Sequence, residues 1–461
     1  MSKQSVTLTY GTESITVEID EAFLAGPVIR PRASAGTPPH EAIAAALAQP
    51  VARPRLREMA KGKRVSIVIS DEFRFGLQDE IIQHFCKELA ESDAASVTFI
   101  CATGSHDPSV YAVNVAKSVD KHAKAQGLAY DFVAHDCDDP TLVEVGRTRR
   151  GTPVILDRAY LQGELRVFGH ESKHHYMAGY SSIDKHVVPG VSARATIEAN
   201  HKNSLSSLSG PGRSPWHIDP ARRDNPFSDD AAEARILADR FVWNPEKNIL
   251  EERAAETFGL DMISKKDSVL ACMAGDPNVI NARMTDFADQ FGMFEVEPTK
   301  YVLISPGGPP ASQAVYGTQN CFDMAMKGAL IPGGEACVLA PCEGRPDLPE
   351  DVKGLAPDGK SKKLFWDNLV RMKDWSLEDA LRFADENFEL YLWKTIKVLR
   401  LFKELDLHIG LHSTLPAERL TEAGFQSVPD VQAWIDERAA RNDGKLRVID
   451  QGNKIFVKAR S

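Results

Sequence analysis

The chain has 461 residues, of which 43% are hydrophobic and 26% charged, so it carries enough apolar material for folded cores. This length exceeds the size at which a single core usually stops growing, and two domains are therefore expected. The formal net charge of −10 argues against nucleic acid as the main partner, because binding phosphates needs an excess of lysine and arginine on one face.

The seven cysteines are scattered, odd in number and never spaced as C-x-x-C, which is typical of reduced thiols inside cells. The N-terminal residues lack the basic and then apolar stretches of a secretory signal. Nowhere do about 18 apolar residues follow one another, as a membrane helix requires. We therefore expect a cytoplasmic, soluble protein without a membrane partner.

The N-terminal half predicts a parallel α/β sheet. Residues 5–20 alternate apolar and polar side chains around Gly11, which is typical of a hairpin. Residues 64–76 and 96–109 each combine a β-branched apolar run with a small polar loop, and the helical stretch 78–92 lies between them. Strand, loop, helix and strand in this order predict parallel strands.

Ligands of parallel sheets bind beyond the carboxyl ends of the strands. Asp71 and Arg74 follow the first strand, and His106 follows the second. A third strand, residues 164–169, leads into the stretch "GHESKHHYMAGYSSIDKH", which holds four of the thirteen histidines. We expect all three segments at one rim of the sheet.

Residues 203–230 are dense in Ser, Gly and Pro, which predicts a long ordered loop or lid. Strand character returns at residues 267–277. A second unit is expected from residue 288, built from a strand and turn, a helix and a further strand. These are residues 300–310, 312–330 and 333–344.

A long helical part, residues 376–406, opens with Ser376 three residues before Asp379, a helix-capping signal. Residues 445–459 read as two strands. We expect residues 1–287 to form an N-terminal α/β domain to which the tail 428–461 returns, and residues 288–427 to form a C-terminal α/β domain. Both sheets are expected to be mainly parallel, with the active site in the cleft between the domains.

The histidine stretch has three interpretations. His170-Glu171-Ser172-Lys173-His174 matches H-E-x-x-H, the zinc peptidase motif, with Glu198 available as a third ligand. That motif needs a helix, whereas this segment follows a strand and runs into glycine and serine. Alternatively, each histidine serves only in packing or in hydrogen bonds to the rim loops.

A third interpretation comes from resemblance. "HYMAGYSSIDKHVVPGV" followed by "ATIEANH" resembles the signature of the lactate racemase family, the nickel-pincer nucleotide enzymes. "SDEFR", "ATGSH", "DNPF", "AGDP", "SPGGPP" and a Lys-Gly at Lys327 support it in the same order. The resemblance spans about residues 64 to 405.

The resemblance implies how the cofactor is held. Lys185 matches the lysine joined covalently, through a thioamide, to the nickel-pincer nucleotide. His201 matches the remaining nickel ligand, and imidazole suits this metal. Asp71 matches an acid that helps to hold the nucleotide.

It also implies the catalytic groups. His106 and His175 match two acid/base histidines, one for each enantiomer of a 2-hydroxy acid, and an imidazole can accept and return a proton near neutral pH. Arg74 matches an arginine at the site whose planar fork suits a carboxylate. Lys327 matches a lysine of the second domain, and closure of that domain would complete the anion pocket. Trp393 matches a tryptophan at the domain junction.

Three departures bear on the substrate. Ser182, Ile183 and Asp184 stand where the family commonly has a serine and two glycines before the lysine. Met324 stands where lactate racemase has a glutamine. The segment "GGPPAS" lacks an Asp that often follows its proline. His170, His174 and His186 could meet hydroxyls of a larger, sugar-derived acid.

The chain is therefore predicted to be a racemase or epimerase of a 2-hydroxy acid, with lactate itself not the expected substrate. Cofactor-synthesis proteins are the expected partners. The competing hypotheses are a zinc hydrolase that uses His170 and His174, and a non-catalytic protein that binds the pincer cofactor.

Overall fold

The computed structural model describes residues 2–72, 76–265, 267–344 and 360–460, and for residues 360–363 it describes the backbone alone. Contacts within the chain divide it into two compact units. Unit 1 comprises Met1–Arg32, His174–Tyr176 and Asp289–Ser461, and unit 2 comprises Ala33–Lys173 and Met177–Ala288. The division after Ala288 lies next to the expected boundary at 287.

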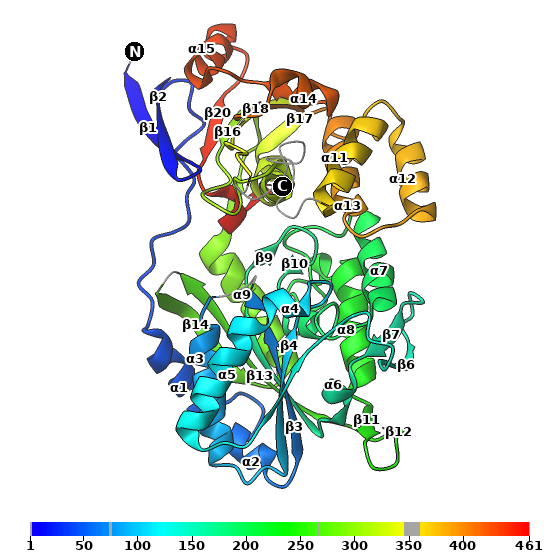
Figure 1. The fold of residues 1–461 in the computed structure, drawn as a ribbon. Helices are drawn as coiled ribbons and strands as arrows, with labels where there is room; N and C mark the ends of the chain where they lie inside the picture. The colour runs from blue at the N-terminus through cyan, green and yellow to red at the C-terminus, as the bar shows by residue number, and fades with distance from the viewer. Residues whose placement is uncertain (1, 73–75, 266, 345–359, 461) are drawn as a thin grey trace. The chain divides into compact units, whose positions relative to one another are not determined.

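Unit 2 is built on a six-stranded sheet with the order β14-β13-β8-β3-β4-β5 (Figure 1). All neighbouring strands are parallel except β13 and β14. The expected strands and the α/β class are confirmed. The strands are β3 (Arg64–Ser70), β4 (Ser96–Ala102), β5 (Asp131–Ala134), β8 (Leu165–Glu171), β13 (Glu256–Lys265) and β14 (Ser268–Gly275).

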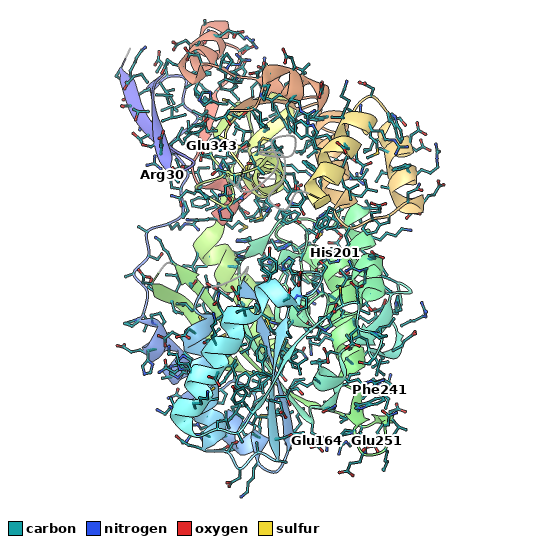
Figure 2. All side chains as sticks on the ribbon, viewed as in Figure 1. Arg30, Glu164, His201, Phe241, Glu251 and Glu343 are labelled. Atoms are coloured by element: carbon teal, nitrogen blue, oxygen red, sulfur yellow. The ribbon has the colours of Figure 1, made fainter. Side chains whose placement is uncertain are left out.

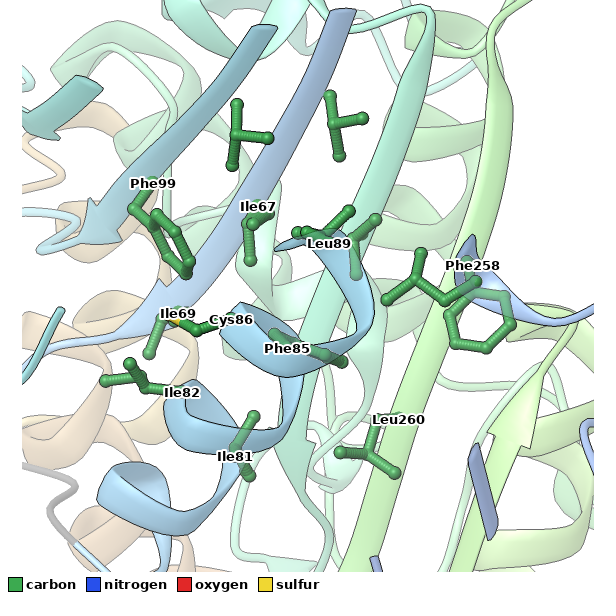
Figure 3. Close-up of a cluster of buried hydrophobic side chains, with 14 of the residues drawn as sticks. Ile67, Ile69, Ile81, Ile82, Phe85, Cys86, Leu89, Phe99, Phe258 and Leu260 are labelled. Atoms are coloured by element: carbon green, nitrogen blue, oxygen red, sulfur yellow. The ribbon is translucent and has the colours of Figure 1, made fainter. Parts of the chain in front are cut away.

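Alternation along β3 explains how this sheet is covered. Ile67 and Ile69 join a buried cluster with Phe85 of α3 (Gln78–Ala90) and Val119 of α5 (Val113–Gln126). Figure 3 shows the α3 side chains of this cluster beside those of β3, β4 and β13. Because both faces of the sheet are covered, β3 reads as an almost continuous apolar run.

The strand order creates a switch point beside β3. From β3 the chain proceeds to β4 and β5 on one side, whereas β8 is added on the other side. A crevice forms at the carboxyl ends of the strands where the order reverses in this way. The loops after β3, β4 and β8 are therefore the segments that the fold makes available for a ligand.

The other elements of unit 2 include the antiparallel pairs β6–β7 and β11–β12. The serine-rich segment ends earlier than expected, because Asn225 accepts hydrogen bonds from the backbone of Phe227 and Ser228 and so begins α8 inside it. The elements are α1 (Pro39–Ala48), α2 (Leu56–Ala60), α4 (Pro108–Tyr111), β6 (Val143–Arg147), β7 (Pro153–Leu156), α6 (Arg158–Gln162), β10 (Gly179–Tyr180), α7 (Arg194–Lys202), α8 (Pro226–Ala238), β11 (Phe241–Asn244), β12 (Ile249–Glu252) and α9 (Pro277–Gly292). The last residues of α9, from Asp289, belong to unit 1.

Unit 1 is built on a parallel five-stranded sheet with the order β19-β18-β17-β16-β20. The expected return of the tail to the first domain is wrong: β20 pairs with β16, and β21 pairs with β15. The strands are β15 (Met293–Val296), β16 (Thr299–Ile304), β17 (Leu330–Leu339), β18 (His408–His412), β19 (Gln426–Ser427), β20 (Leu446–Ile449) and β21 (Phe456–Ala459).

The predicted N-terminal hairpin, β1 (Lys3–Tyr10) and β2 (Glu13–Asp20), is confirmed, but it belongs to unit 1. Its buried residues Leu8 and Ile19 cluster with Tyr301 of β16 and Val448 of β20. The hairpin buries one apolar face there, which is why residues at the two ends of the sequence share a core.

The helices of unit 1 are α10 (Val315–Cys321), α11 (Lys360–Met372), α12 (Leu377–Glu386), α13 (Leu392–Lys403), α14 (Ala417–Glu422) and α15 (Val431–Arg441). Ser376 caps α12 by accepting from the backbone N–H of Asp379 at 3.1 Å, as its position predicts. The long helical part is two helices, because the chain breaks before Tyr391, which has a φ of +84°. Among the described residues, no helix combines the length and apolarity needed to cross a membrane.

A glycine sets the approach of α3 to the sheet. A Cβ at Gly169 of β8 would lie 2.6 Å from Cγ2 of the buried Ile81. We expect Gly169→Ala to lower the free energy of unfolding by about 1–3 kcal/mol, the usual cost of overpacking. Gly210→Ala is the control, because nothing lies within 4 Å of its added Cβ. Equal urea midpoints for both variants would contradict this.

Candidate active site

The loops after β3 and β4 meet through a histidine and a carboxylate. His106 Nδ1 lies 2.5 Å from Asp71 Oδ2, and the Asp71 side chain is only 3% exposed. Asp71 Oδ1 is also buried and has no hydrogen-bond partner among the described residues. A buried carboxylate oxygen without a partner is costly, so this atom is suited to receive a donor from a ligand.

The same turn is bonded to the segment that holds Lys185. The backbone N–H of Gly104 donates to the carbonyl of Gly190 at 3.0 Å, and Gly190 in turn donates to the carbonyl of Lys185 at 3.0 Å. The two predicted loops, from residues 103–106 and 185–190, are therefore fixed to each other by main-chain hydrogen bonds. Lys185 itself is buried in a short 3₁₀ helix, residues 183–186.

Asp184 anchors this 3₁₀ helix in the core. Its carboxylate accepts from Arg235 of α8 and from the Trp216 indole, both at 2.6 Å, and from Asn281 of α9 at 3.2 Å. Burial disfavours the charge on Arg235, but the neighbouring Asp184 and Asp239 carboxylates raise its pKa above the usual range. The residue before Lys185 is therefore held from three different elements.

Ile183 is fitted to the strand beneath it. A Cβ at Gly259 of β13 would lie 2.6 Å from Ile183 Cδ1, and the Ile183 N–H donates to Asn281 at 3.1 Å. The two departures from the family's glycines thus have structural roles, because Ile183 fills space over Gly259 and Asp184 forms the buried ion pair.

His201 lies on α7 and is labelled in Figure 2. Its Nδ1 lies 2.8 Å from the carbonyl of Ile197, and its ring meets that of Phe227 edge-on. A carbonyl can only accept, so Nδ1 is the donor, and in the neutral tautomer the lone pair of the ring is at Nε2. Histidine ligands of metals commonly have their other nitrogen fixed in this way.

The zinc peptidase motif does not lie on a helix. His170 lies in the strand β8, whereas His174 belongs to unit 1, where its Nε2 lies 2.9 Å from Asp289. His170 Nδ1 lies 3.0 Å from His186 Nε2, and both rings are buried. The structural basis of the zinc hydrolase hypothesis is therefore wrong: these two histidines do not share a helix face.

A buried acid lies beside His170. Asp261 of β13 is paired with His170 across the parallel strands and accepts from the Ser172 hydroxyl at 2.6 Å. Burial raises its pKa to about 7, although hydrogen bonds from Ser172 and from the backbone work in the opposite direction.

His175, Lys327 and Trp393 lie in unit 1. The ring of His175 stacks on that of Tyr176. Trp393 Nε1 donates to the Tyr176 hydroxyl at 3.4 Å, so Tyr176 contacts both of these predicted site residues. Lys327 is exposed and follows a π-helical turn, residues 322–326, a deviation that is frequent at functional sites.

The structure brings Asp71, His106 and the Lys185 segment together within unit 2 and places His201 in the same unit. Arg74 lies outside the described residues. Sequence reasoning did not single out Arg235, Trp216 or Asp261. Asp261 interrupts the apolar run of its strand and could have been noticed there, whereas Arg235 and Trp216 follow no motif.

Comparison with known proteins agrees with this geometry. Residues 10–211 match the family "Lactate racemase N-terminal domain". The chain is similar to two lactate racemases over 98% of its length. It is 23% identical to that of Lactiplantibacillus plantarum, of which it covers the whole. It is 21% identical to that of Thermoanaerobacterium thermosaccharolyticum, of which it covers 99%.

The fold is also similar to solved structures. The lactate racemase apoprotein from Thermoanaerobacterium thermosaccharolyticum superposes with a TM-score of 0.78 at 18% identity, covering 99% of this chain and all of the other. A protein from Thermotoga maritima superposes with a TM-score of 0.60 at 14% identity, covering 93% of this chain and all of the other. These matches agree with the resemblance found in the sequence: residues 10–211 match the N-terminal domain of the lactate racemase family, and the fold of the chain is that of the lactate racemase apoprotein.

The buried ion pair at Asp184 gives a stability test. Arg235→Met leaves the Asp184 carboxylate charged and buried, and we expect it to lower the free energy of unfolding by about 3–5 kcal/mol. Arg240→Met removes an exposed pair with Glu252, 60% and 69% exposed, and should cost about 1 kcal/mol or less. Urea unfolding measures both, and equal losses would contradict the assigned role of the pair.

Asp261 gives a pH test. Its folded-state pKa of about 7 exceeds the unfolded value of about 3.9, so the folded state binds the extra proton between these values. Stability therefore falls as pH rises across this window, by about 1.4 kcal/mol per pH unit, and levels off above it.

Asp261→Asn lacks this ionisation. We expect its unfolding free energy, relative to the parent chain, to increase between pH 5 and pH 8, whereas the exposed Asp374→Asn control should show no such trend. If the difference in unfolding free energy between the Asp261→Asn chain and the parent were the same at pH 5 and pH 8, the raised pKa would be contradicted.

Proposed function

We propose that this chain inverts the hydroxyl-bearing α-carbon of a 2-hydroxy acid, as a racemase or epimerase. The observation that carries the proposal is a network of hydrogen bonds between the loops at the switch point of unit 2. There, the Asp71–His106 pair and the main-chain bonds from Gly104 through Gly190 to Lys185 hold a proton-transfer group and an amine on connected loops. The two lactate racemases that match over nearly the whole chain support the same reaction class.

We further propose a lysine-tethered nickel-pincer nucleotide as the cofactor. The residues fit this group: Lys185 offers a buried amine, His201 an imidazole whose Nδ1 is held by a carbonyl, and Asp71 a buried oxygen without a partner among the described residues. In this assignment Lys185 carries the nucleotide, His201 binds nickel, and Asp71 Oδ1 accepts a hydroxyl of the nucleotide. The cofactor, when bound, supplies hydride transfer from and to the substrate carbon.

His106 would move the substrate's hydroxyl proton. The Asp71 carboxylate can only accept, so in the neutral ring His106 Nδ1 carries the proton and Nε2 carries the lone pair that acts as base. After Nε2 takes a proton, the same carboxylate stabilises the resulting imidazolium. Asp71 is thereby a positioning residue for His106 as well as a cofactor contact.

His175 would serve the opposite enantiomer, and Lys327, Arg74 and Trp393 would help to bind the substrate. Two bases are needed because the two enantiomers of the acid place their hydroxyl groups differently. Each hydroxyl therefore needs its own proton-transfer group. The stacking of His175 on Tyr176, which itself receives the Trp393 indole proton, supports a fixed orientation for the ring.

We propose that the substrate is a hydroxy acid other than lactate, and that it is larger or sugar-derived. Met324, at the position of the family's glutamine, is buried and cannot donate a hydrogen bond to a substrate. His170 and His186 support this less than the sequence suggested, because they are buried and bonded to each other. The substrate proposal is tested by comparing the turnover of gluconate-type acids with that of lactate. Inactivity on every polyhydroxy acid would contradict it.

The remaining alternative is a non-catalytic protein that binds the pincer cofactor. The orientation of His106 by Asp71 favours catalysis, because a carrier needs no oriented base. Activity separates the two classes, because a carrier should tolerate His106→Ala and His175→Ala without functional loss.

The two histidines are tested in chain produced together with cofactor-synthesis proteins, its expected partners. We expect His106→Ala and His175→Ala each to reduce racemisation at least 100-fold, the usual contribution of a general acid/base. Intact mass should show that cofactor attachment is retained in both.

His408→Ala, an exposed histidine on β18, is the control and should keep full activity. Racemisation is followed by the change in optical rotation. Unchanged rates in either active-site variant would contradict its assignment as a base.

A further inference from the structure

Three potential metal ligands meet on unit 2, on helices rather than on the rim loops. His40 lies in the first turn of α1, and Glu80 and His84 lie on α3. Atoms of all three lie within 4.8 Å of one another. Glu80 and His84 are four residues apart, so they share one helix face.

The distances suit one ion. His40 Nδ1 lies 3.1 Å from His84 Nε2 and 3.8 Å from Glu80 Oε2. Donors bound at about 2.0–2.1 Å in a tetrahedral site lie about 3.3–3.4 Å apart, so small shifts bring these atoms into that geometry. Without an ion, one of these two nitrogens donates a hydrogen bond to the other.

The carboxylate supplies an independent observation. Glu80 Oε2 is buried and has no hydrogen-bond partner among the described residues. A buried carboxylate oxygen normally has a donor or a cation beside it, since its desolvation is otherwise uncompensated.

We propose that His40, Glu80 and His84 form a binding site for a divalent transition ion, with zinc as the ion that the donors suit best. Two imidazoles and one carboxylate leave the fourth tetrahedral position to water. The site would join α1 to α3, whose residues Ile43 and Phe85 already share the core of unit 2. It is separate from the proposed cofactor, whose nickel ligand is His201.

The other cluster of potential ligands in the described residues does not qualify. Asp136, Cys137 and Asp138 are consecutive, and both carboxylate oxygens of Asp138 accept from Arg194, at 2.7 and 2.5 Å. Burial raises the pKa of the Cys137 thiol to about 11, so it is not a ready thiolate ligand.

The test is calorimetric titration of the metal-stripped full chain with zinc chloride. We expect one zinc per chain at this site, and an affinity at least tenfold weaker in His40→Ala and in Glu80→Gln. His40 is exposed, so its variant should fold like the parent, which the thermal midpoint without zinc verifies. His408→Ala is the matched control and should bind zinc like the parent.

Cobalt provides a second readout. The parent chain loaded with Co²⁺ should show the intense visible bands of a tetrahedral site, and His40→Ala should lose them. The thermal midpoint of the parent, but not of His40→Ala, should rise with zinc, because ligand bound to the folded state stabilises it. Equal zinc affinity in the parent and His40→Ala, or no zinc binding by the parent, would overturn the proposal.

Discussion

The buried ion pair between Asp184 and Arg235 is the constraint on which the proposed site depends. A charge that is 1–2% exposed is tolerated only where partners compensate its lost hydration, and Asp184 has Arg235, Trp216 and Asn281 for this purpose. These donors come from α8, the serine-rich segment and α9. The residue before Lys185 is thereby fixed in space.

The parallel sheet provides the second condition for function. Its strands end together at a switch point, which brings Asp71 and His106 from separate loops to a distance of 2.5 Å. Main-chain bonds through Gly190 then connect this pair to Lys185. Catalytic groups held by backbone and by a buried carboxylate lose little entropy when a substrate binds, which is the advantage of a rigid scaffold.

Much of this could be predicted from sequence, because β-branched runs such as residues 64–70 have a strong local signal. The α/β class and the strands were predicted and are confirmed, and the comparisons agree with the resemblance to the lactate racemase family. The roles of His106, His175, Lys185 and His201 stay predictions. Non-local pairing could not be predicted: Arg235 is 51 residues from Asp184, and no spacing rule links them. The tail was assigned to the wrong unit for the same reason, since the apolar pattern of a strand does not specify which other strand it pairs with.

The central claim is that Lys185 carries the cofactor. Intact mass followed by peptide mapping of chain produced together with the cofactor-making proteins tests it most directly. The account predicts an added mass equal to that of the tethered nucleotide on the peptide containing Lys185, and none in Lys185→Arg. An added mass on another residue, or none in active chain, would contradict it.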